Sequence, residues 1–107
     1  MENRITSYNA ASEYLKYRDM KRKLRAELIT AEDKESAEWK RVEAMEARTD
    51  DVPMDEYNAI YDAYEMAIAI RKDIEYKMEL AEQAMELFKK LDECLSDIEY
   101  INDNSKG

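Results

Sequence analysis

The scarcity of glycine and proline is the feature that most constrains this chain. Pro53 is its single proline and Gly107 its single glycine, against usual frequencies of about 5% and about 7%. Sheets and α/β folds need turn-forming residues at short intervals, so the sequence predicts long helices with very few connections. With 45% apolar and 40% charged side chains, residues 1–107 are expected to form a single helical domain rather than a disordered chain.

The single proline lies almost at the midpoint of the 107 residues. Because proline disfavours the α conformation in the residue before it, Val52 should lie outside a helix. Asp55 is a suitable N-cap for the helix that follows, and Glu56 favours the positive end of that helix's dipole. The predicted elements are a helix over 7–49, a turn over 50–54, a helix over 55–101 and a frayed tail over 102–107.

Apolar residues in the second half recur at alternating steps of three and four, with Arg71 and Asp92 at two positions where apolar residues would fit. This heptad rhythm predicts a long, continuous helix of the coiled-coil type. Together with the central turn, it predicts an all-α fold, a long antiparallel helical hairpin. The heptad residues are Tyr57, Ile60, Tyr61, Tyr64, Ala67, Ile74, Met78, Ala81, Met85, Phe88, Leu95 and Ile98.

The first half is less regular. A stripe formed by Tyr8, Ala11, Leu15, Tyr17, Met20, Leu24, Leu28 and Ala31 is followed by few large apolar residues until Trp39, Val42 and Met45. Thr30 with Asp33 resembles a capping box, and Ser36 could cap a new segment. We therefore allow a break near 31–36, which would give three helices, although nothing there forbids a continuous helix.

Charge is distributed unevenly along the chain. Residues 1–30 carry a net charge of +3, whereas residues 31–56 and 57–107 carry −6 each, for a total of −9. If residues that face each other have numbers summing to about 104 to 106, the basic run lies beside Glu79, Glu82 and Glu86. A phosphate-binding patch is the alternative interpretation of this run. Its members are Lys16, Arg18, Lys21, Arg22, Lys23 and Arg25.

The second helix carries another apolar stripe, offset from the first, formed by Tyr76, Leu80, Leu87 and Leu91 together with Cys94. A helix that is apolar on two faces needs partners on both. Residues 36–49, folded as a third helix, could cover this stripe, but they adjoin the turn and can hardly reach it. We therefore expect self-association of two hairpins into a bundle, that is, a homodimer.

The composition excludes most catalytic chemistry. The chain has no histidine, one cysteine and no glycine-rich loop, so the usual nucleophile arrangements, zinc sites and phosphate cradles are absent. Glu75, Glu79, Glu82 and Glu86 share one helix face and could in principle hold a hard cation, but this spacing is more typical of solvated or salt-bridged carboxylates. We expect no enzyme activity, no catalytic or metal-binding residues and no cofactor.

Two functions remain compatible with the sequence. Eight tyrosines and seven methionines suit adaptable protein contacts, which predicts a protein–protein interaction module with an acidic, tyrosine-rich helical surface. The alternative is an acidic inhibitor of phage or mobile-element type, such as an anti-restriction or anti-CRISPR protein, which blocks a basic nucleic-acid-binding protein by local DNA mimicry. Neither function involves direct nucleic-acid binding or a membrane, and a cytoplasmic location is expected. The candidate partner-binding face is Glu43, Glu46, Asp50, Asp51, Asp55, Glu56, Asp62 and Glu65.

Overall fold

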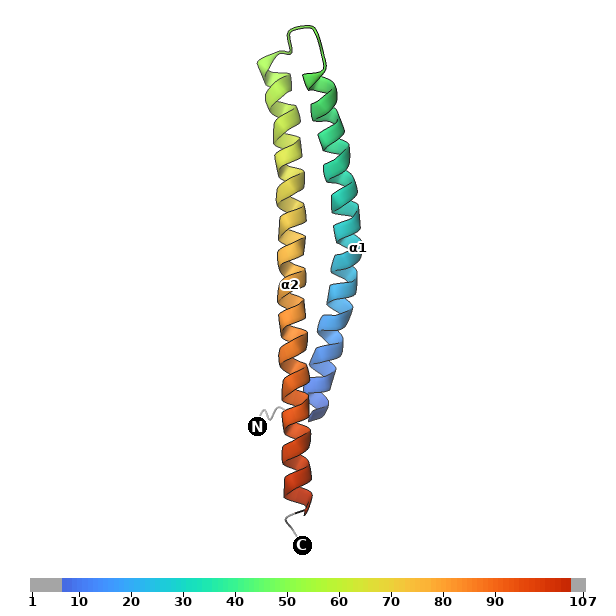
Figure 1. Cartoon of the computed structure of the whole chain (residues 1–107), viewed down its shortest axis with the longest axis vertical. Coiled ribbons are helices and arrows are strands. Elements are labelled where there is room, and N and C mark those ends of the chain that lie inside the picture. The colour runs from blue at the N-terminus through green and yellow to red at the C-terminus, as the bar shows by residue number, and fades with distance from the viewer. Residues whose placement is uncertain (1–6, 105–107) are drawn as a thin grey trace. The chain divides into compact units, whose positions relative to one another are not determined.

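The computed structural model describes residues 7–104, nearly all of which belong to two helices (Figure 1). Helix α1 spans Ser7–Glu46 and helix α2 spans Met54–Asn104. Residues 47–53 connect them, and no strand occurs among the described residues. The predicted all-α fold, a hairpin of two long helices, is therefore confirmed.

The chain divides into two compact parts. The turn unit consists of residues 24–77 and contains the connection between the helices. The terminal unit combines the chain up to Lys23 with the chain from Met78 onward, and its described residues are 7–23 and 78–104. The two helices run antiparallel within each unit. In each unit, the residue later in α1 contacts the residue earlier in α2.

In the turn unit, each helix contributes side chains to one heptad seam. Val42 is the largest fully buried side chain, at 1% exposure, and Trp39 packs against Tyr64 with ring centroids 5.2 Å apart. The alternation of three- and four-residue steps keeps both rows facing each other, as in a coiled coil. The α1 row is Leu24, Leu28, Ala31, Glu35, Glu38, Val42 and Met45, and the α2 row is Ile60, Tyr64, Ala67, Arg71 and Ile74.

Helix α1 continues without a break through residues 31–36, so the three-helix variant is wrong. Thr30 does not cap a new segment. Its hydroxyl donates to the carbonyl of Ala26, four residues earlier, at 3.4 Å, which is an interaction of a helix interior. Glu38 forms ion pairs with Lys34 at 3.2 Å and with Arg41 at 2.9 Å. Residues of high helix propensity and ion pairs at these spacings maintain the helix here.

In the terminal unit, Tyr17 stacks on Phe88 with centroids 5.8 Å apart, and Lys21 forms an ion pair with Glu82. The numbers of these facing residues add up to 105 and 103, close to the expected register. Within the basic run, Lys21 forms an ion pair with a residue of α2. Arg18 and Arg22 instead form ion pairs with Asp19 on their own helix, at 3.5 and 3.9 Å. The expected alignment of charges is thus only partly realised.

The α1 stripe expected from the sequence is wrong at Leu15 and Met20, which are 45% and 41% exposed. The structure places Ala10, Tyr14 and Lys21 on the seam instead. A lysine is acceptable at this position because Glu82 lies across from it, and its methylene groups can pack while the ammonium group stays at the edge. The sequence pattern misleads because the charge that compensates Lys21 belongs to the other helix.

The element boundaries differ from the prediction at three points. Helix α1 ends at Glu46 rather than at residue 49, and α2 reaches Asn104 rather than residue 101. Pro53 caps α2, since its carbonyl accepts the first helical hydrogen bond, from the amide of Tyr57 at 3.0 Å. Asp55 is therefore not the N-cap but lies in the first turn, where its charge still favours the helix dipole. Residues 105–107 of the predicted tail lie outside the described residues.

Candidate functional site

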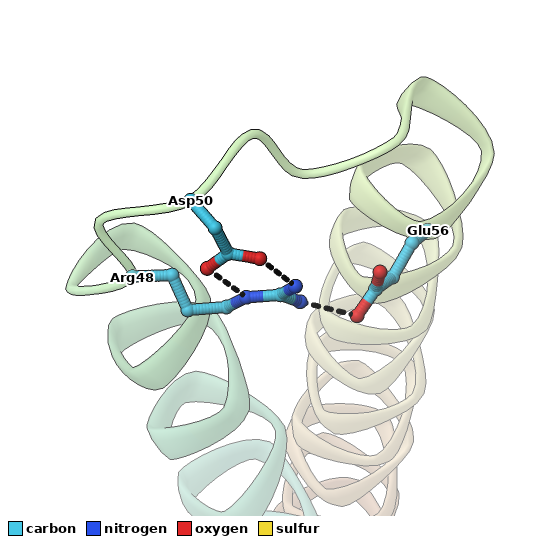
Figure 2. Close-up of polar contacts among 3 residues, drawn as sticks. All are labelled: Arg48, Asp50 and Glu56. Atoms are coloured by element: carbon cyan, nitrogen blue, oxygen red, sulfur yellow. Dashed lines mark hydrogen bonds and ion pairs between the residues drawn. The ribbon is translucent and has the colours of Figure 1, made fainter.

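The connection between the helices is held by a cluster around Arg48 (Figure 2). The guanidinium donates from Nε and Nη2 to the two carboxylate oxygens of Asp50, at 3.1 and 2.6 Å. Its Nη1 donates to Glu56 in the first turn of α2, at 2.7 Å. Because a planar guanidinium presents donors in a rigid fork, it binds both carboxylates at once. Arg48 thereby joins the end of α1, the loop and the start of α2, and we call these three residues the Arg48 clasp.

The clasp shifts the protonation of its members. The hydrogen bonds that Arg48 donates to Asp50 first, and then to Glu56, raise the pKa of Arg48, so that it stays charged. The hydrogen bond from Arg48 holds the pKa of Asp50 below its ordinary value of 3.8. Since all three side chains are exposed or nearly so, water and salt screen these interactions, and the clasp orders the loop more than it stabilises the fold.

A second polar contact joins the helices near the turn. The hydroxyl of Tyr61 donates to the carboxylate of Glu46, the last residue of α1, at 2.5 Å. This hydrogen bond stabilises the protonated hydroxyl, so the pKa of Tyr61 is raised above its ordinary value of 10.0. The ring of Tyr61 also lies 4.8 Å from that of Tyr57. Glu46 therefore serves as an interhelical acceptor.

The eight carboxylates predicted as a partner-binding face are all exposed and all belong to the turn unit. They fall into two groups. Asp50, Glu56 and Glu46 are engaged by Arg48 or Tyr61. The others form no ion pair with any residue in the described range, and we call these five the open acids: Glu43, Asp51, Asp55, Asp62 and Glu65.

Apolar side chains lie among these acids in the sequence. Met54 and Tyr57, in the first turn of α2, are 69% and 39% exposed. Further along the turn unit, an open groove of about 300 Å³ is lined by Glu32, Glu35, Ser36, Trp39 and Tyr64. An exposed aromatic ring beside carboxylates offers a contact surface that is apolar at its centre and charged at its rim.

Sequence reasoning identified the acids but missed the role of Arg48. It is the only basic residue between positions 43 and 65, and that isolation was the available signal. The eight-residue separation of Arg48 from Glu56 follows no helical spacing, because the loop lies between them. Only the course of the connection brings the two groups together.

The residues predicted for self-association lie on α2. Tyr76, Leu80 and Leu87 are 59%, 45% and 63% exposed, and Leu91 is half-buried. Tyr76 belongs to the turn unit and the three leucines belong to the terminal unit. Their contact with a second copy stays a prediction.

Within the described part of the chain, no group of three or more acidic or cysteine side chains is arranged to hold a metal ion. Neither helix has, between residues 7 and 104, a stretch long and apolar enough to cross a membrane. No model of a known protein family, no curated protein and no solved structure matches this chain.

Proposed function

We propose that this chain is a non-enzymatic protein–protein interaction module that binds a basic partner through the acidic, tyrosine-bearing surface of its turn unit. The observation that carries this proposal is the Arg48 clasp. In the clasp, the only positively charged side chain between positions 43 and 65 is paired with two carboxylates. The five open acids stay exposed and have no such partner. A surface so depleted of positive charge attracts cationic partners and repels acidic ones.

Order in the connection is the second support. A loop that is fixed before binding loses less conformational entropy when a partner docks. Arg48 donates to a loop carboxylate and to an α2 carboxylate at once, and Tyr61 adds an interhelical hydrogen bond to Glu46. The open acids Asp51 and Asp55 therefore lie on, or directly beside, a braced loop.

The exposed aromatic and thioether side chains provide the third support. Charge alone gives attraction and orientation, while most binding energy at interfaces comes from a few large, desolvated side chains. Met54 and Tyr57 are exposed in the same first turn that contains Asp55 and Glu56. They are the candidates for the apolar centre of the contact.

The experiment compares two variants that change charge equally. The test variant E43Q/D51N/D62N/E65Q neutralises four open acids. The control E79Q/E86Q/E93Q/E99Q neutralises four exposed acids elsewhere on α2. Both have a net charge of −5 instead of −9. Each protein is immobilised and used to capture partners from the source organism, and the captured partner is then purified and titrated.

The wild type and the control should bind the same basic partner, and the test variant should lose it. Affinity should also fall as salt rises, since exposed charges are screened. Equal binding by both variants, or equal loss in both, would contradict the proposal. Asp55 is left unchanged because its charge favours the start of α2.

The inhibitor hypothesis is a special case in which the basic partner binds nucleic acid. The concentration of eight acids against Arg48 within residues 43–65 is what favours it. Competition with duplex DNA separates the two cases. An inhibitor that occupies the nucleic-acid groove should be displaced by DNA from the captured partner, whereas binding elsewhere should be unaffected by it.

A further inference from the structure

The terminal unit contains a second heptad row on α2, separate from the row that packs on α1. Its six residues are Ala84, Leu87, Leu91, Cys94, Ile98 and Ile101, spaced at steps of three and four. Leu87, Ile98 and Ile101 are 63%, 46% and 62% exposed, and Cys94 is exposed as well. The sequence pattern assigned Ile98 to the first heptad row, but its exposure places it in this second row instead. Apolar side chains repeated at 3.5-residue intervals fit the knobs-into-holes packing of another helix. We call this row the outer row.

The orientation of the outer row fits a helix with two helical neighbours. Leu87, Leu91 and Cys94 each precede by one residue a member of the α1-facing row: Phe88, Asp92 and Leu95. At 3.6 residues per turn, one residue corresponds to a rotation of about 100°. That is close to the right angle between the two contact faces of a helix in a four-helix bundle.

The outer row has a defined beginning. The preceding positions of the same rhythm are Leu80, Lys77 and Asp73. Lys77 and Asp73 form an ion pair with each other at 2.8 Å, and Asp73 raises the pKa of Lys77. The Lys77–Asp73 pair interrupts the apolar repeat, and the uninterrupted part that follows it, from Leu80 onward, belongs entirely to the terminal unit.

Charged residues beside the outer row indicate which helix it accepts. In an antiparallel pairing of two copies of α2, with facing numbers summing to about 185, Leu87 meets Ile98 and Leu91 meets Cys94 of the second copy. The flanking residue Lys90 then lies near Asp97 of that copy, and the same pair occurs twice by symmetry. A parallel pairing would instead bring Lys90 beside Leu95, which offers no counter-charge.

We propose that the outer row is a homodimer interface in which the C-terminal parts of two α2 helices pack antiparallel, with Lys90 and Asp97 paired across the symmetry axis. Self-complementarity of one surface patch is what a two-fold dimer requires. This interface is separate from the acidic surface of the turn unit, so either proposal can fail without the other.

The first experiment measures the mass of the protein in solution by light scattering and by sedimentation. At a protein concentration of about 0.1 mM or below, the wild type should be a dimer, with twice the mass of the 12.7 kDa chain. Its dissociation into monomers on dilution should give a measurable dissociation constant. L87E should weaken the dimer at least about 100-fold, because it buries a charge opposite Ile98 in each half of the interface. M66E is the matched control: Met66 is 67% exposed on the same helix but lies in the turn unit, before the Lys77–Asp73 interruption, so the dimer should persist.

Circular dichroism shows whether L87E keeps its helices, which separates loss of the dimer from loss of the fold. A wild type that stays monomeric at about 0.1 mM would overturn the proposal and assign the row to a different chain. A dimer that L87E leaves intact would overturn it as well, because the contact would then lie elsewhere.

The second experiment tests the pairing of Lys90 with Asp97. K90D and D97K should each weaken the dimer about tenfold, because each replaces two attractive contacts by two repulsive ones. The exchanged variant K90D/D97K has the wild-type net charge and should recover the wild-type affinity. In a parallel dimer, position 90 would lie beside Leu95 of the second copy, so K90D alone would leave affinity unchanged. That result would overturn the antiparallel arrangement.

Discussion

Glu35 on α1 and Arg71 on α2 face each other across the seam of the turn unit, and Nε of Arg71 donates to the Glu35 carboxylate. Nη1 of Arg71 also donates to Glu75 on its own helix, at 2.9 Å. These hydrogen bonds, the one to Glu35 first, raise the pKa of Arg71 and keep it charged. A slip of one heptad would bring Arg71 opposite Leu28 or Val42. The ion pair therefore selects the register, which is the best-attested role of polar residues in a seam.

Replacing both members of this pair should be less harmful than replacing either one. E35L leaves Arg71 without its interhelical partner, and R71L leaves a half-buried carboxylate without its own. Both single variants should unfold at lower temperature than the wild type, and E35L/R71L should recover much of the loss because it restores an apolar contact. Thermal denaturation, followed by circular dichroism, measures the stability of the wild type and the three variants, which together form a double-mutant cycle. Additive losses would show that Glu35 and Arg71 are not coupled.

The packing of Val42 should dominate the stability of the turn unit. V42A removes two methyl groups from the largest fully buried side chain and should lower the free energy of unfolding by about 2 kcal/mol. I29A is the control, since Ile29 is 58% exposed on the same helix and should change stability by less than about 0.5 kcal/mol. Urea titration measures both. Equal effects would mean that Val42 does not pack in the seam.

Acid titration should reveal the Arg48 clasp. The pKa of Asp50 is lower in the folded chain than its ordinary 3.8, so its contribution is present above pH 3.8 and is lost as the pH falls through the lowered value. The carboxyl carbon shift of Asp50, followed by NMR, should have a midpoint below 3.8. In R48M the midpoint should return toward 3.8. An unchanged midpoint in R48M would contradict the clasp.

The continuity of α1 can be tested at Ser36. Proline in a helix interior removes a hydrogen bond and clashes with the preceding turn, so S36P should cost about 3 kcal/mol or more. If a new helix instead began at position 36, proline at that position would be tolerated. S36A is the control and should be neutral or slightly stabilising, since alanine has the higher helix propensity. The measurement is the loss of helical ellipticity and the urea midpoint.

The candidate site follows only in part from the order of the residues. The eight acids near the turn are visible in the sequence, and all of them are exposed. The division between engaged and open acids is not visible. It depends on where the loop carries Arg48 relative to Glu56 and on the approach of Tyr61 to Glu46. Those approaches are properties of a folded connection, and no local rule predicts them.

The sequence by itself determined the helical class, the turn before Pro53 and the heptad rhythm of α2, because helix propensity, the steric effect of proline and periodicity act between near neighbours. Only the tertiary structure decided which face of α1 meets α2. Lys21 and Glu35 occupy the seam while Leu15 and Met20 stay exposed. A charged residue is stable at such a position only when an opposite charge lies across from it. Here that charge is 61 residues away for Lys21 and 36 residues away for Glu35.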